Sequence, residues 1–147
     1  MLTIGDVKEV AAMYDRLVLQ VVEAEDTCVI SLRFKSGGIA QININQFQKP
    51  NESVIEFAGT KGNLAIDFAK LKFANDDSGN WETVDHMAGL KPMEAHEARF
   101  ALQANLFLDA VEGKPCHLTT LDEARKNLRV ALAAKESYET KRIVVLE

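Results

Sequence analysis

The sequence predicts an α+β fold, built as an open-faced, mostly antiparallel β-sheet with helices packed on one face. Segments in which apolar and polar residues alternate, as in strands, fill the first half of the chain. Segments with helical periodicity dominate the second half, and this separation disfavours alternating strand–helix–strand units. The 147 residues, 47% hydrophobic and 27% charged, fit a single globular domain spanning residues 1–147.

The strand segments are expected at residues 7–22, 26–34, 39–47, 54–58, 63–68, 70–74 and 81–85. The second segment alternates most clearly, with Cys28 and Leu32 on one face and Val29 on the other. Glycine-containing turns at residues 36–38 and 59–62 join neighbouring strands. The acidic residues just before the second segment, Asp26 among them, are interpreted as a solvated turn.

Two helices and a short final strand are expected after these segments. Residues 94–111 form the first helix, with its buried stripe at Phe100, Ala104, Phe107, Leu108 and Val111. The second helix begins at Thr120, because the tetrapeptide TLDE is a capping box. Its buried stripe is expected at Ala124, Leu128, Ala131, Leu132 and Tyr138. Residues 142–146 end the chain as an apolar strand.

The charge balance argues against a protein that binds nucleic acid. Lys and Arg number 17 and Asp and Glu number 22, which leaves a net charge of −5, whereas nucleic-acid binders carry a basic surface. No apolar run reaches the roughly 20 residues of a membrane helix, and no signal peptide opens the sequence. Cys28 and Cys116 lack motif spacing, which favours a reduced, cytoplasmic protein without membrane partners.

The usual catalytic and metal-binding motifs are missing from the sequence. His86, His96 and His117 lack the spacing of zinc ligands, so we expect no metal site. Neither G-x-G-x-x-G nor G-x-S-x-G occurs, and the GTKG at residues 59–62 lacks the spacing of a phosphate loop. We therefore expect no catalytic and no cofactor-binding residue in this chain. A small hydrolase built on the adjacent Cys116 and His117 is a minor alternative.

Amide side chains line one face of the third strand segment. Gln41, Asn43 and Asn45 alternate with Ile42 and Ile44, and three amides in a row are poor material for a dry core. This face is open to solvent, packs against another subunit, or lines a polar ligand cleft. The residues by themselves leave these three possibilities open.

Several short motifs, taken in order and spacing, point to a known family. They are GDVKEV at 5–10, EDT at 25–27 with LRFKSGG at 32–38, IEFAGTKGNL at 55–64, LTTLDEA at 118–124, and AAKES at 133–137 with RIV at 142–144. In this arrangement they resemble the C-terminal domain of the glucose–fructose oxidoreductase, inositol dehydrogenase and MocA (Gfo/Idh/MocA) family. The resemblance extends from Ile4 to Leu146.

The resemblance implies that this chain is one half of an NAD(P)-dependent oxidoreductase acting on a sugar, polyol or related compound. In that family an N-terminal Rossmann domain binds the cofactor and supplies the catalytic Lys, and a junction element supplies the acid–base His. Since this chain has neither, we expect a truncated piece that is inactive alone and holds no cofactor itself, while the full-length parent uses NAD or NADP.

The resemblance also suggests where this domain meets its partners. The open sheet face of the family commonly forms a homo-oligomer interface, here Gln41, Asn43, Asn45 and Phe47. The loop that follows often reaches the substrate, which makes Gln48, Lys49 and Asn51 the candidate substrate-binding residues. The alternative is a free-standing, non-enzymatic protein-interaction or ligand-binding module with the same fold.

Overall fold

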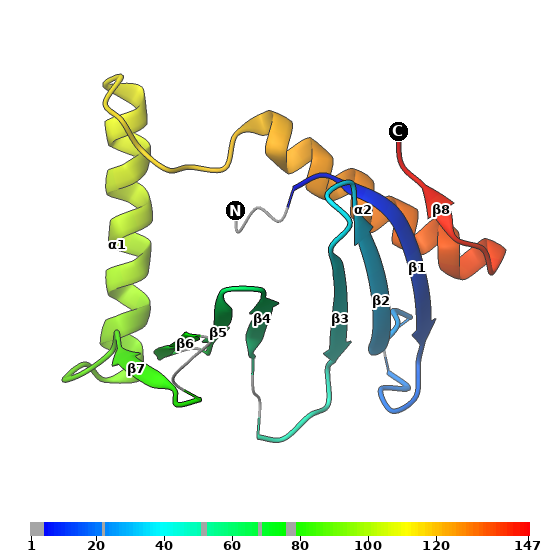
Figure 1. Ribbon diagram of the computed structural model, residues 1–147, viewed down its shortest axis with the longest axis horizontal. Coiled ribbons are helices and arrows are strands. Elements are labelled where there is room, and N and C mark those ends of the chain that lie inside the picture. Colours follow the sequence, from blue (N-terminus) through cyan, green and yellow to red (C-terminus); the bar gives the residue numbers. More distant parts are fainter. Residues whose placement is uncertain (1–4, 22, 51–52, 68, 76–78) are drawn as a thin grey trace. The chain divides into compact units, whose positions relative to one another are not determined.

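The computed structural model describes residues 5–21, 23–50, 53–67, 69–75 and 79–147 (Figure 1). The chain divides into two compact units. The first unit joins Met1–Gln48 to Thr119–Glu147, so it is assembled from both ends of the sequence. The second unit is the intervening segment, Lys49–Leu118.

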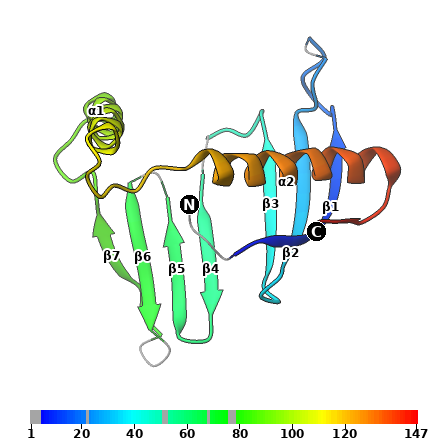
Figure 2. The ribbon, with the colours of Figure 1, turned by 90° about the horizontal axis from the view of Figure 1, so that it is seen from above.

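The first unit is a four-stranded antiparallel sheet with a helix on one face. Its strand order is β3-β2-β1-β8. The strands are β1 (Val7–Asp15), β2 (Thr27–Phe34), β3 (Ile39–Asn45) and β8 (Val144–Val145), and the helix is α2 (Leu121–Thr140). Figure 2 shows α2 crossing β3, β2 and β1. The open-faced, helix-covered sheet predicted from the sequence is therefore present in this unit.

The core of the first unit lies between the sheet and α2. Val10, Leu32 and Phe34 from the strands meet Ala133 and Ala134 from the helix, and all five are buried. Alanine has a short side chain, so the helix backbone lies close to the larger strand residues that fill the space. Burying apolar surface here contributes about 25 cal/mol per Å² removed from water.

The buried face of α2 is not the stripe expected from the sequence. Leu128 and Leu132 are 60% and 59% exposed, whereas Ala133, Ala134 and Ser137 are buried. The prediction followed the largest apolar side chains, but two overlapping stripes on this helix have suitable spacing. The structure uses the stripe of small residues, and of the expected positions Tyr138 is partly buried, with its ring stacked on Tyr14.

The second unit contains an antiparallel sheet with the order β4-β5-β6-β7. Its strands are β4 (Ile55–Gly59), β5 (Gly62–Ile66), β6 (Lys70–Asn75) and β7 (Glu82–Asp85). Each strand pairs with the next one along the chain, and the pairing of β4 with β5 confirms the turn predicted at residues 59–62. Gly59 pairs with Gly62, so Thr60 and Lys61 form a two-residue turn and the GTKG segment is a hairpin.

Helix α1 (Pro92–Val111) belongs to the second unit. Ala95 near its N-terminus is 3% exposed. The expected buried stripe is wrong, because Phe100, Phe107 and Val111 are 60%, 60% and 69% exposed. The helical spacing was read correctly, but periodicity does not reveal what covers an apolar face.

Other boundaries differ modestly from the sequence prediction. The first strand ends at Asp15 instead of continuing to residue 22. The third strand ends at Asn45, so Phe47 lies beyond it. Within the described residues, no helix is long and apolar enough to cross a membrane. The α+β class itself is confirmed.

Candidate functional site

The uncovered face of the first sheet carries the amides that the sequence singled out. Residues opposite each other in an antiparallel pair point to the same face of the sheet. The register pairs Gln41 with Ser31 and Asn43 with Val29, and Asn45 follows the same alternation. All three amides therefore point away from α2. The predicted division of β3 into an amide face and an apolar face is present in the structure.

The remaining side chains of this face are a mixture of apolar and charged groups. We call it the open sheet face, and it comprises Glu9, Ala11, Met13, Val29, Ser31, Arg33, Ile39, Gln41, Asn43 and Asn45. Met13 is 75% and Ile39 69% exposed. Arg33 Nε lies 3.1 Å from Glu9 Oε2, so an ion pair joins β2 to β1. Exposed apolar groups, amides and an ion pair on one surface suit contact with another protein.

The opposite face of β3 is only partly covered. Ile42 pairs with Ile30 and Ile44 with Cys28, which places them on the α2 face as expected. They nevertheless remain 37% and 46% exposed. The helix packs mainly over β1 and β2, where Val10 and its neighbours are buried.

The loop after β3 is tied to the end of that strand through two amide side chains. The backbone N–H of Gln48 donates to Asn45 Oδ1 over 2.8 Å, and Asn45 Nδ2 donates to Gln48 Oε1 over 3.2 Å. The structure thus joins one predicted interface residue to one predicted substrate residue. Gln48 keeps its own amide nitrogen available as a donor.

The other predicted residues of this loop are not gathered into a cluster. Lys49 is exposed and begins the second unit. Asn51 lies outside the described residues. Phe47, 37% exposed, follows the end of β3 and so does not take part in the alternation of that strand. Its place at an interface, like the substrate role of Lys49 and Asn51, stays a prediction.

Asp26 is a structural residue that the sequence reasoning missed. Its side chain is 2% exposed instead of solvated, and it accepts hydrogen bonds from the backbone N–H groups of Leu17, Val18 and Leu19 at 2.9, 2.7 and 2.6 Å. The Thr27 hydroxyl also donates to it. Burial by itself would raise the pKa of Asp26. The hydrogen bonds together have the larger, opposite effect, so the pKa of Asp26 lies well below its ordinary value.

Cys28 and Cys116 are free thiols, both partly buried. Burial raises the pKa of the Cys28 thiol, and the negative charge of Glu25 adds to this effect, so the thiol is less nucleophilic. In the part of the chain that the structure describes, no three His, Cys, Asp or Glu side chains group as metal ligands would.

Comparison with known proteins identifies relatives of this fold. Residues 1–65 match the family model described as the GFO/IDH/MocA C-terminal domain. No curated protein sequence matches the chain. Solved structures of oxidoreductases match nearly the whole chain, at sequence identities that establish the fold alone.

Three of these structures illustrate the likeness. An NAD-binding oxidoreductase from Klebsiella pneumoniae has a TM-score of 0.81 and 18% identity, over 97% of this chain and 46% of its own. Levoglucosan dehydrogenase in complex with NADH and L-sorbose has a TM-score of 0.77 and 20% identity, over 97% and 45%. An oxidoreductase from Agrobacterium radiobacter with NAD+, L-tartaric acid and magnesium has 0.74 and 19%, over 96% and 44%. The chain thus spans less than half the length of each.

Proposed function

We propose that this chain is a C-terminal domain of the Gfo/Idh/MocA family, and that it is the substrate-side and oligomerisation domain of an NAD(P)-dependent oxidoreductase. One observation carries the proposal. Residues 1–65 match the family model, and the chain shares its fold with part of longer proteins that are oxidoreductases. The substrate class we propose is a sugar, polyol or related hydroxylated compound, such as those in the relatives' complexes.

The chain's own residues do not fit a dinucleotide. A dinucleotide site of the Rossmann type places the pyrophosphate at a glycine-rich turn between a parallel strand and a helix. Every strand pair in the described residues is antiparallel, and neither helix follows such a turn. We therefore assign NAD or NADP to an N-terminal Rossmann domain of the parent protein, and derive no cofactor contact from this chain.

For this chain we propose two roles in the parent enzyme. The loop after β3, with Gln48, Lys49 and Asn51, contributes donors to the hydroxyl or acidic groups of the substrate. The open sheet face forms the contact with a second copy of the chain. The hydrogen bonds between Asn45 and Gln48 support a link between the two roles, because they anchor the loop to the interface strand.

We also propose a cytoplasmic location for the parent protein. Both cysteines are free thiols, which fits a reducing compartment.

An assay of the complete reading frame that contains this chain tests the proposed function. The frame upstream of the Leu2 codon is expected to encode a strand followed by G-x-G-x-x-G. The full protein is expected to reduce NAD+ or NADP+ with at least one member of a panel of sugars and polyols. A stop codon directly upstream, or no turnover across the panel with either cofactor, contradicts the proposal.

Two variants of the full protein test the loop. Gln48→Ala and Lys49→Ala are each expected to raise KM about tenfold with little change in kcat, because they remove binding away from the reacting atoms. Lys61→Ala, in the exposed hairpin turn between β4 and β5, is the matched control and should leave both constants unchanged. Equal effects of all three variants would remove the loop from the substrate site.

A further inference from the structure

The connection between β1 and β2 is a loop with exposed apolar side chains. Leu17 and Val18 are at least half exposed, and Val21 is 93% exposed. We call these three residues the apolar loop. Figure 2 shows the connection extending beyond the ends of both strands. Exposed apolar groups gathered on one short segment are typical of a contact with another molecule.

Asp26 holds the apolar loop in one conformation. Its buried carboxylate accepts the N–H groups of Leu17, Val18 and Leu19, and its own N–H donates to the main-chain oxygen of Asp15 over 3.1 Å. A loop that is already ordered loses little conformational entropy when it binds. The apolar side chains are therefore preorganised for contact.

The charges beside the apolar loop favour a protein surface over a membrane. Glu23 and Glu25 follow the loop and are exposed. The anionic lipids of a membrane surface attract basic segments and repel acidic ones. A lipid surface is therefore a poor partner for this loop.

The open sheet face has a hollow at the end remote from this loop. Its volume is about 140 Å³, and its lining includes Glu9, Ala11, Ser31, Arg33, Ile39 and Ile143. The carboxylate of Glu9 pairs with the guanidinium of Arg33, so the rim is balanced in charge and suits an apolar group better than an ion. An apolar cavity of about 150 Å³ accommodates benzene. The hollow is thus large enough for a valine or leucine side chain.

The apolar loop and the hollow lie at opposite ends of one face. Asp15 pairs with Thr27 at the loop end, and Glu9 pairs with Arg33 at the hollow. The stretch of β1 between these pairs measures roughly 20 Å at about 3.3 Å per residue. In a two-fold symmetric pair, residue i of one copy contacts residue j of the other, and j contacts i in return. Two stacked open sheet faces whose strands run in opposite directions therefore place each loop over the partner's hollow.

We propose that a second copy of this chain receives the apolar loop, with Val21 of each copy inserted into the hollow of the other beside Ile39 and Ile143. The proposal rests on the oligomerisation role proposed above for the open sheet face, and it assigns the contact to defined side chains. Asn43 lies on the strand between the two ends and faces the amides of the second copy.

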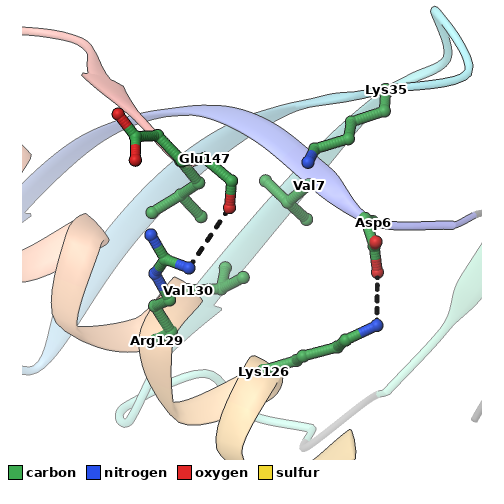
Figure 3. Close-up of a pocket in the computed structure, with 8 residues that line it drawn as sticks. Asp6, Val7, Lys35, Lys126, Arg129, Val130 and Glu147 are labelled. Carbon is green, nitrogen blue, oxygen red and sulfur yellow. Dashed lines mark hydrogen bonds and ion pairs between the residues drawn. The ribbon is translucent and has the colours of Figure 1, made fainter.

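A second small cavity of the first unit, between β1 and α2, has charges that balance one another (Figure 3). Lys35, Lys126 and Arg129 border it together with Asp6 and the side-chain and terminal carboxylates of Glu147. Lys126 Nζ donates to Asp6 Oδ1 over 2.9 Å, and Arg129 Nη1 donates to the main-chain oxygen of Glu147 over 3.2 Å. These contacts join α2 to the strands, and they leave no excess charge to select a ligand.

Charge substitutions test the loop contact from both sides. Val21→Asp and Ile39→Lys each place a charge in an apolar contact, and each is expected to weaken dimerisation of the 147-residue chain at least about tenfold. Sedimentation velocity gives the dissociation constants. Leu121→Asp is the matched control, because Leu121 is 90% exposed and begins α2, which covers the opposite face of the sheet. Circular dichroism confirms that each variant is folded.

The double variant shows whether the two positions meet. Val21→Asp combined with Ile39→Lys brings opposite charges together across the proposed contact. We expect its dissociation constant to lie within about threefold of that of the unsubstituted chain, since substitutions at contacting positions are not additive.

Losses in both single variants with recovery in the double variant support the loop contact. Three results would overturn it: dimerisation of Val21→Asp as tight as that of the unsubstituted chain, losses that add in the double variant, or an equal loss in Leu121→Asp. A mass of one chain for the unsubstituted protein at every concentration would overturn it as well.

Failure of the loop contact is distinguishable from failure of the proposed function. If Asn43→Arg disrupts the dimer and Val21→Asp does not, the open sheet face joins two copies and only the loop contact is wrong. The masses also do not depend on whether the full protein oxidises a sugar or polyol, which the assay of the complete reading frame measures separately.

Discussion

At the scale of single residues, two buried polar side chains, Asp26 and Ser137, stabilise the first unit through their hydrogen bonds. Ser137 on α2 is 3% exposed. Its hydroxyl accepts the N–H of Ala12 over 3.0 Å and donates to the main-chain oxygen of Arg142 over 2.6 Å. The strand pairing of β8 with β1 is at Glu9 and Val10. The hydrogen bond from Ala12 to Ser137 lies beyond that pairing, further along β1. One hydroxyl therefore extends the pairing along the edge of β1.

Removing the Ser137 hydroxyl is expected to lower the stability of the fold. Ser137→Ala leaves the N–H of Ala12 without its acceptor at a partly buried site, and we expect the free energy of unfolding to fall by about 1–3 kcal/mol. Thr140→Ala removes an exposed hydroxyl from the same helix and should change stability by less than about 0.5 kcal/mol. Urea denaturation of the two variants measures the difference. Equal losses would mean that the Ser137 bridge contributes little.

Asp26 makes stability depend on acid pH. Because its pKa is lowered by folding, the stability that its ionised form contributes is fully present above the unfolded value, about 3.9. That contribution is lost as the pH falls from there toward the folded pKa. We expect Asp26→Asn to unfold at a lower temperature at pH 7 and to lose less stability between about pH 4 and pH 2 than the parent chain.

The control for this variant lies in the same turn. Glu25 is exposed, so Glu25→Gln removes a neighbouring carboxylate without disturbing the hydrogen bonds to Leu17, Val18 and Leu19. Melting curves recorded across the acid range compare the three chains. If the melting temperature of Asp26→Asn fell as steeply with decreasing pH as that of the parent chain, other carboxylates would be the cause of the acid destabilisation.

At the scale of elements, the turn between β4 and β5 depends on a glycine. Gly62 has φ +137°, and a Cβ built there would lie 2.3 Å from the main-chain oxygen of Ala74 on the neighbouring strand β6. A side chain at this position therefore meets both backbone strain and a backbone clash. The close pairing of three consecutive strands requires the position to be free of a side chain.

A comparison of two glycines separates strain from clash. Gly62→Ala is expected to lower the free energy of unfolding by about 2–4 kcal/mol, since both effects apply. Gly89→Ala, in the same unit at φ +84° with nothing within 4 Å of the added Cβ, should show strain alone, about 1–2 kcal/mol. Thermal or chemical denaturation measures both variants. Equal effects would contradict the clash with β6.

For helix α2, the sequence pattern predicted the N-terminal cap but not the buried face. The start of α2 was predicted correctly, because Thr120 accepts the N–H of Glu123 while the Glu123 carboxylate accepts the N–H of Thr120. Such caps are local and can be read from four residues. The buried face is not local, and the stripe containing Leu128 was chosen although the sheet meets the stripe containing Ala134.

At the scale of the whole molecule, the open sheet face is the surface for which a second copy is proposed. It lies on the side of the sheet opposite α2 and displays Met13 and Ile39 beside the amides of β3. Exposed apolar side chains surrounded by polar groups are typical of contact sites. Asn43 lies in the middle of this strand.

An added charge on this face tests self-association. If the face joins two copies, Asn43→Arg brings like charges together across the contact and should weaken dimerisation at least about tenfold. Asn127→Arg adds the same charge to an exposed position of α2 and should leave it unchanged. Light scattering across micromolar concentrations gives the masses. A mass of one chain for the unsubstituted protein at every concentration contradicts the proposed interface.

The sequence by itself determined the features that depend on neighbouring residues. These are the alternation of β2 and β3, the hairpin of β4 and β5, the cap at Thr120 and the α+β class. Short motifs added a resemblance to the Gfo/Idh/MocA C-terminal domain, and the model of that domain matches residues 1–65. Such features follow from backbone periodicity and turn chemistry, which act over a few positions.

Only the tertiary structure decided which groups meet across long separations in the chain. It placed Asp26 over the amides of Leu17 to Leu19, Ser137 against Ala12, and Lys35 beside Lys126 and Arg129. A polar residue looks the same in sequence whether it faces solvent or satisfies a buried amide. The difference arises because buried hydrogen-bonding groups must find partners wherever the fold brings them, and packing, not local pattern, determines where that is.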